Sequence, residues 1–166
     1  MFLLRPIRFL VTALVEDNTP KRMAIGFALG VVVGLVPKGN LIAITLMMLL
    51  GFLRVNLGTG MVTAFIFSWI GMLLDPVTHM IGLFVLTHEA LRSTWISFGD
   101  MPLAPWTDFN NSIVLGSFLL GLVLAYPSYR ISEPLFAKYT PDWRERLLKL
   151  KIVHLLWGTD ITNKLT

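Results

Sequence analysis

Residues 34–44 read GLVPKGNLIAI, in which a proline, a lysine, a glycine and an asparagine separate two uncharged apolar runs. The first run covers residues 23–36 and the second covers residues 41–53. As helices that rise ~1.5 Å per residue, each reaches roughly 20 Å, whereas the hydrocarbon core of a bilayer is about 30 Å thick. Each run is therefore too short to span, and the stretch predicts a helical hairpin, residues 23–53, whose polar tip ends inside a membrane.

The composition is that of an integral membrane protein. Of 166 residues, 55% are hydrophobic and only 14% are charged, and the mean hydropathy is +0.71. An ordinary soluble domain has roughly 25% charged residues. The chain has no cysteine, which excludes disulfides and thiolate metal sites. The net charge of +4 comes from basic residues near the two ends, without a stacking or groove-reading motif, so nucleic acid is not an expected partner.

Hydropathy and charge along the chain predict an all-α membrane domain over residues 20–127. After the hairpin, an apolar helix is interrupted at Asp75-Pro76, and the segment that follows residue 87 is acidic. The predicted parts are the hairpin 23–53, a broken helix 57–87, an extracytoplasmic loop 88–111 and a spanning helix 112–127.

Amphipathic interfacial helices are expected at both ends of the chain. Residues 1–17 place leucines and an isoleucine on one side of a helical wheel and arginines on the other, which suits an anchor in the membrane interface. Residues 128–166 form a basic cytoplasmic tail, in which a helix is predicted over residues 141–157. That helix is either interfacial, held by tryptophans and basic side chains, or a docking helix for a partner.

The distribution of charge favours the re-entrant hairpin over a hairpin whose arms both cross the bilayer. Complete crossings would place the two basic ends of the chain on opposite sides. A re-entrant hairpin keeps both ends and Arg54 in the cytoplasm and the acidic loop outside, as the positive-inside rule prefers. The expected location is therefore the bacterial inner membrane, with several passes and both termini cytoplasmic.

The breaks at Pro37 and Pro76 have similar surroundings. Asn40 and Asp75 are both favourable N-cap residues, so each break is expected to start a new half-helix whose free N–H groups lie at membrane depth. Short or broken segments in corresponding positions are typical of transporter binding sites. The competing explanation is a chance similarity between two apolar hairpins.

Lys38 is the most costly residue of the hairpin, and charges at membrane depth are functional candidates by default. Helix N-termini beside it favour an anion such as a lipid phosphate. The alternative is that Lys38 extends to an interface or forms an ion pair with Asp75. The candidate site for an anionic substrate consists of Lys38, Gly39, Asn40, Asp75, Thr78 and His79.

Three glycines recur every fourth residue in the first arm of the hairpin, at Gly26, Gly30 and Gly34. This spacing lets another helix approach closely. Either they pack internally, most simply against the second arm of the same hairpin, or they form an interface with another copy or a partner.

Catalysis is not expected. The candidates for acid–base or metal chemistry are Asp75, His79, His88 and Glu89, but His88-Glu89 lacks the second histidine of HExxH, and there is no G-x-S-x-G nucleophile motif. The sequence predicts no catalytic residue, no metal site and no cofactor.

The hairpin resembles the bacterial membrane family known as domain of unknown function 2062, over roughly residues 15–90. The family's pattern has a proline before a glycine-rich helix, a P-x-G turn, an apolar helix and an R-x-N pair. These features fall here at Pro20, Ala24, Gly26, Gly30, Gly34, Pro37, Gly39, Arg54 and Asn56. A later N-P-x-T element of the family appears as 75–78, with Asp75 in place of the asparagine. The resemblance implies an inner-membrane location, no established chemistry, and an association of short members with a larger envelope protein of the bridge-like lipid-transfer type.

Two functional hypotheses follow. The first is a small inner-membrane subunit that assists transport of lipid or another anionic solute. Its expected partners are membrane lipids and either further copies of itself or a larger envelope protein. The second is a non-catalytic anchor or assembly factor for an envelope complex. Transport predicts a groove or cavity that reaches the breaks, whereas an anchor predicts a packed interior and an exposed glycine face.

Overall fold

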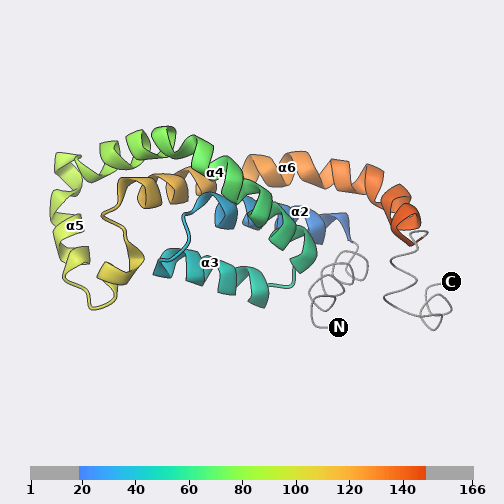
Figure 1. Ribbon diagram of the computed structural model, residues 1–166, viewed down its shortest axis with the longest axis horizontal. Coiled ribbons are helices and arrows are strands. Elements are labelled where there is room, and N and C mark those ends of the chain that lie inside the picture. The colour runs from blue at the N-terminus through green and yellow to red at the C-terminus, as the bar shows by residue number, and fades with distance from the viewer. Residues whose placement is uncertain (1–18, 149–166) are drawn as a thin grey trace.

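A computed structural model of the protein describes the backbone of residues 19–148 and the side chains of residues 19–140. Every regular element in this part of the chain is a helix, which confirms the all-α class (Figure 1). Helices α4, over its whole length, and α6, over Ser112–Thr140, are long and apolar enough to cross a membrane. The elements are α2 (Pro20–Leu35), α3 (Leu41–Phe52), α4 (Leu57–Leu86), the 3-10 helix η1 (Glu89–Leu91), α5 (Arg92–Gly99), the 3-10 helix η2 (Ala104–Thr107) and α6 (Ser112–Leu148).

Helix α2 forms the core of the molecule together with α4 and α6, against both of which it packs. Every residue from 30 to 36 is buried. Phe27 packs edge-on against Phe67 of α4 and Phe136 of α6, with ring centroids 6.1 and 6.2 Å apart. After Lys21 and Arg22 in its first turn, α2 is uncharged and rich in valine and small residues, which suits this central position because this part leaves no polar side chain to be satisfied.

The glycine row of α2 faces α4. A Cβ atom at Gly26 would lie 2.5 Å from the carbonyl oxygen of Asn56, and one at Gly30 would lie 2.5 Å from that of Gly60. Gly34 meets Phe67 in the same way. Helices α2 and α4 are therefore parallel and in close backbone contact. The glycine row packs internally, but against α4; the prediction that it packs against the second arm of the hairpin is wrong.

Helix α6 is antiparallel to both α2 and α4. Gly82 of α4 lies against the backbone of Ser112, and Gly116 of α6 lies against the backbone of Thr78, so these two helices also approach at glycines. Further along α6, a Cβ atom at Gly121 would lie 3.2 Å from the Cα atom of Val32. Small residues thus determine all three close approaches in the core.

Helix α4 continues through Asp75-Pro76, and the predicted break of the segment 57–87 is wrong. Pro76 lacks an N–H group and so removes only the hydrogen bond to the carbonyl four residues earlier. Ending the helix there would expose several backbone groups in apolar surroundings, at a larger cost. Asp75 is consequently an interior residue of α4, and the two prolines, Pro37 in a turn and Pro76 in a helix, do not mark repeated structures.

Helix α3 returns alongside the core but is attached to it loosely (Figure 1). Only Ala43 and Leu50 of this helix are buried. Five of its large apolar side chains are exposed: Ile44, Met47, Met48, Leu49 and Phe52. In water such a surface would be unfavourable, whereas lipid would solvate it.

The segment 88–111 contains η1, α5 and η2, where the sequence predicted a loop. Trp95 stacks on Phe109 at 5.9 Å between centroids and donates a hydrogen bond of 3.2 Å from its indole N–H to the carbonyl of Val85 at the end of α4. Phe98 packs edge-on against Phe109 at 4.7 Å. This aromatic cluster holds the segment against the far end of α4.

Helix α6 differs from its predicted boundaries at its C-terminal end. A spanning helix was expected over 112–127, with a separate helix beginning at residue 141, but α6 is continuous from Ser112 to Leu148. Prolines at 127, 134 and 141 each cost one hydrogen bond and do not end it. The remainder of the predicted helix 141–157, and the N-terminal helix 1–17, lie outside the described residues.

Candidate functional site

Lys38 lies in the turn between α2 and α3, and its ammonium group caps the end of α2. It donates hydrogen bonds to the carbonyl oxygens of Val33, Gly34 and Val36 at 2.5, 3.1 and 2.7 Å. An ammonium has three hydrogens, so all of its donors are in use. The last carbonyls of a helix carry partial negative charge, and a lysine beside them is stabilising. The charge of Lys38 is thus compensated within its own turn.

Asn40 is the N-cap of α3, as predicted. Its side-chain oxygen accepts a hydrogen bond of 2.9 Å from the N–H of Ala43, and its amide donates one of 2.8 Å to the carbonyl of Pro37. The side chain is buried. Gly39 has a φ of 105°, a conformation that residues with a Cβ atom rarely adopt, which explains a glycine at this position. The sharp turn therefore follows from Gly39 and Asn40 together.

The other candidate residues lie where α4 crosses α6. Thr78 is buried and donates a hydrogen bond of 3.1 Å from its hydroxyl to the carbonyl of Asp75. His79 is exposed, and its Nδ1 atom lies 2.6 Å from the hydroxyl oxygen of Ser112. The side-chain partners of Thr78 and His79 come from the protein itself, which is typical of polar residues that pack helices together.

The structure does not unite the two halves of the predicted site. Within residues 19–140, no hydrogen bond or ion pair joins the turn at Lys38 to Asp75, Thr78 or His79, so the ion pair with Asp75, one of the alternatives for Lys38, is not formed. The end of α2 instead lies against Gly71, where a Cβ atom would be 3.1 Å from the carbonyl oxygen of Leu35. A site shared by both breaks requires two facing half-helices, and α4 is one uninterrupted helix.

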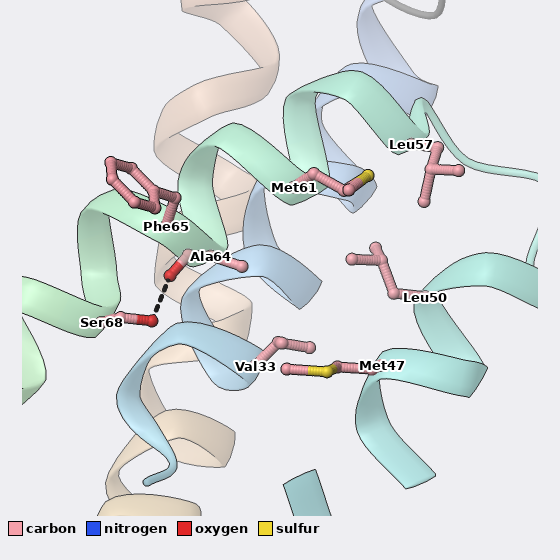
Figure 2. Close-up of a pocket in the computed structure, with 8 residues that line it drawn as sticks. All are labelled: Val33, Met47, Leu50, Leu57, Met61, Ala64, Phe65 and Ser68. Atoms are coloured by element: carbon pink, nitrogen blue, oxygen red, sulfur yellow. Dashed lines mark hydrogen bonds between the residues drawn. The ribbon is translucent and has the colours of Figure 1, made fainter. Parts of the chain in front are cut away.

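A cleft of about 300 Å³ opens between α3 and the pair formed by α2 and α4 (Figure 2). In Figure 2 the side chain of Met47 extends from α3 toward Val33 of α2. The only hydroxyl in the lining, that of Ser68, donates to the carbonyl of Ala64 at 2.7 Å and offers little to a polar ligand. The lining residues are Val33, Met47, Leu50, Leu57, Met61, Ala64, Phe65 and Ser68. A cleft with this lining suits a hydrocarbon chain.

Asn56, which the sequence argument did not include in the site, is the polar residue most deeply set in the core. It is fully buried, and its side-chain oxygen caps α4 by accepting a hydrogen bond of 2.7 Å from the N–H of Thr59. Its own N–H donates to the carbonyl of Arg22 at 3.2 Å. Its position three residues before Thr59, at the start of a long apolar run, is the N-cap signal that identifies it.

Charged residues separate toward the two ends of the described chain. Arg22 and Arg54 lie where α2 and α4 begin, and the contact of Met23 with Thr140, 3.6 Å from sulfur to hydroxyl, brings the basic stretch around Lys138 to the same end. The acidic residues Glu89, Asp100 and Asp108 follow the other end of α4. Among the described residues, no three histidine or acidic side chains gather in a way that would hold a metal ion.

Comparison with known proteins places these observations in a family. No solved structure matches the chain. An uncharacterized protein of Treponema pallidum (strain Nichols) is 21% identical over 131 residues, which cover 79% of this chain and 81% of that protein. The bacterial family described as "Uncharacterized protein conserved in bacteria (DUF2062)" matches residues 5–144. The match covers most of the chain, including the hairpin, the glycine row and all of α4, and the protein is a member of this family.

Proposed function

We propose that the protein is a small inner-membrane subunit that assists lipid transport by holding an acyl chain beside α3, in cooperation with a partner. The observation that carries this proposal is the apolar cleft of about 300 Å³ between α2, α3 and α4. This volume is at the lower end of the roughly 300–1,000 Å³ that ligand sites occupy. The loose attachment of α3, whose outward side chains are also apolar, gives such a chain a lateral entrance from the bilayer.

The depth of the hairpin supports its re-entrant placement. The turn follows Leu35, which meets Gly71, and Gly71 lies ~21 Å along α4 from its start at ~1.5 Å per residue. The whole of α4 is ~45 Å long on the same basis, and a hydrocarbon core measures about 30 Å. The turn therefore lies beside the middle of α4, which in this proposal is a membrane depth where only protein or a wet cavity tolerates non-helical backbone. The hydrogen bonds of Lys38 and Asn40 satisfy that backbone internally.

The orientation in the membrane follows from the charges. The basic end, with Lys21, Arg22 and Arg54, is cytoplasmic in this proposal, and the acidic segment after α4 is extracytoplasmic, in keeping with the positive-inside rule. The exposed apolar side chains of α4, among them Phe65, Trp69 and Leu73, then face lipid.

A second candidate function, an anchor or assembly factor, is favoured by the packing of the core. Helices α2, α4 and α6 meet at glycines, and the hydroxyls of Thr78 and Ser117 bond to carbonyls of their own helices. Such a core needs no ligand. The anchor hypothesis also predicted an exposed glycine face, however, and Gly26, Gly30 and Gly34 are buried against α4.

The two functions are distinguished by filling the cleft. Met47 lines it and its neighbour Met48 does not, and both lie on α3 with similar exposure, 45% and 54%. A deletion strain is complemented with the natural protein, Met47→Trp or Met48→Trp, and the arrival of pulse-labelled phospholipid in the outer membrane is measured. The lipid function predicts that labelled phospholipid arrives slowly in the deletion strain and with Met47→Trp. With Met48→Trp it is expected to arrive at the same rate as with the natural protein. Natural arrival with Met47→Trp, where the protein level is unchanged, would contradict it and favour the anchor.

A further inference from the structure

A cationic residue lies in the chain between two residues that line the cleft. Leu50 and Leu57 both line it, and Arg54 lies in the short connection between them. Arg54 is exposed, and within the described residues its guanidinium makes no hydrogen bond and no ion pair. An arginine in the connection between two lining residues of an apolar cleft offers a planar set of donors, and carboxylates and phosphates are the groups that match this geometry.

Other basic residues strengthen the positive potential at this end. The hydrogen bond from the N–H of Asn56 to the carbonyl of Arg22 places the beginning of α2 beside the beginning of α4, so that Lys21 and Arg22 lie at the same end as Arg54. Of the acidic side chains in the described residues, Asp75, Glu89, Asp100 and Asp108 belong to the middle of α4 and to the segment beyond its far end, and Glu133 lies on α6. An anion at Arg54 is therefore attracted by several positive charges.

From this arrangement we infer that the cleft holds an anionic phospholipid, whose phosphate binds Arg54 and whose acyl chain lies between α3 and α4. The inference rests on the proposed function and adds the class of lipid to it. The direction fits a bilayer: Arg54 is at the proposed cytoplasmic interface, and the cleft runs from there past Met47 toward Val33 near the end of α2. The head group is thus held at the opposite end of the hairpin from Lys38, whose three donors are occupied.

Charge complementarity selects this occupant. A free phosphate would use Arg54 and leave the apolar cleft unfilled, and a zwitterionic lipid would carry a cation toward Lys21, Arg22 and Arg54. A basic side chain near an anionic membrane surface contributes ~1 kcal/mol, which corresponds to about fivefold in affinity. Removal of the Arg54 charge is therefore expected to lower the preference for an anionic lipid by about that factor.

The test is native mass spectrometry of the full-length chain in a nonionic detergent, with equal amounts of dioleoyl phosphatidylglycerol and dioleoyl phosphatidylcholine. The natural protein is expected to retain one phosphatidylglycerol in preference to phosphatidylcholine. Arg54→Gln reduces that preference about fivefold, whereas Arg92→Gln, an exposed arginine at the acidic end, leaves it unchanged. Met47→Trp reduces retention of both lipids, and Met48→Trp does not. Circular dichroism confirms that each variant retains its helix content.

The outcomes separate the two proposals. If both lipids bind equally, or if Arg54→Gln leaves the preference unchanged, while Met47→Trp still displaces lipid, then the head-group inference is overturned and the acyl-chain cleft stands. If Met47→Trp and Met48→Trp retain lipid equally well, the cleft is not the site. The inference then fails, and the proposed function fails with it because the cleft no longer supports it.

Discussion

Lys38 is a charged residue between two apolar helices, yet its ammonium donates to three carbonyls at the end of α2. The ammonium group and the carbonyls that compensate its charge all belong to residues 33–38. The same holds for Asn40, which bonds both forward to Ala43 and back to Pro37. The residues that appeared most functional from the sequence are therefore fully engaged in shaping a turn.

Replacement of Lys38 tests this capping role. Lys38→Met is expected to lower the free energy of unfolding by about 1–2 kcal/mol, because it removes charge-assisted hydrogen bonds from the end of α2. The measurement is unfolding in mixed micelles followed by circular dichroism. Lys138→Met, at an exposed lysine that lies 5.4 Å from the ring of Tyr139, is the control and changes stability by less than about 0.5 kcal/mol. Equal stability of the two variants would show that the cap contributes nothing.

Gly30 carries a second prediction at the residue scale. Gly30→Ala places a methyl group 2.5 Å from the carbonyl oxygen of Gly60, so we expect a loss of about 1–3 kcal/mol in the free energy of unfolding. Gly51→Ala is the matched control, because nothing lies within 4 Å of its added Cβ atom and alanine favours a helix by roughly 0.5–1 kcal/mol. Both are measured by the same unfolding assay. A neutral Gly30→Ala would mean that α2 and α4 are not in backbone contact.

At the scale of elements, the continuity of α4 changes the meaning of Asp75. Asn56 begins this helix through a capping hydrogen bond, whereas Asp75 occupies an interior position and is not a cap. A proline after an aspartate predicts a helix start from local preference alone. A continuous helix loses only one backbone hydrogen bond at Pro76, whereas a helix end would leave several groups without partners, and this difference outweighs the local preference.

Alanine substitutions at the two positions distinguish a cap from an interior residue. Asn56→Ala is expected to cost about 1 kcal/mol or more, since it removes a cap at a fully buried position. Asp75→Ala is expected to change stability by less than about 0.5 kcal/mol, because no capping bond is lost. The free energies of unfolding of both variants are compared in one detergent. A cost at Asp75 as large as that at Asn56 would indicate that a new helix begins there.

For the whole molecule, the main feature is the separation of charge along a long, apolar bundle. Arg54 lies at the end where α2 and α4 begin, and Asp100 lies in the segment beyond the other end of α4. The hairpin reaches about half the length of α4, ending near Gly71. The proposed orientation, with the cleft open toward the cytoplasmic leaflet, rests on these facts.

Thiol labelling tests this orientation, and the natural absence of cysteine gives a clean background. Both Arg54 and Asp100 are exposed. With a membrane-impermeant reagent, Asp100→Cys is expected to be labelled in intact cells, and Arg54→Cys only after the cells are opened. Labelling of both variants in intact cells would place both ends outside and rule out the proposed topology.

The sequence by itself determined the features that depend on nearby residues. An apolar composition with few charges predicted long apolar helices, and two helices in the described part of the chain are long and apolar enough to cross a membrane. Gly39 with Asn40 specified the turn and the start of α3, because caps and turns are formed by residues a few positions apart. Only the tertiary structure decided that Gly26, Gly30 and Gly34 pack against α4, that α4 continues through Pro76, and that the cleft lies beside α3. These features depend on which of several apolar surfaces meet. Glycines and apolar side chains are compatible with many partners, so their spacing alone does not identify the one that the fold selects.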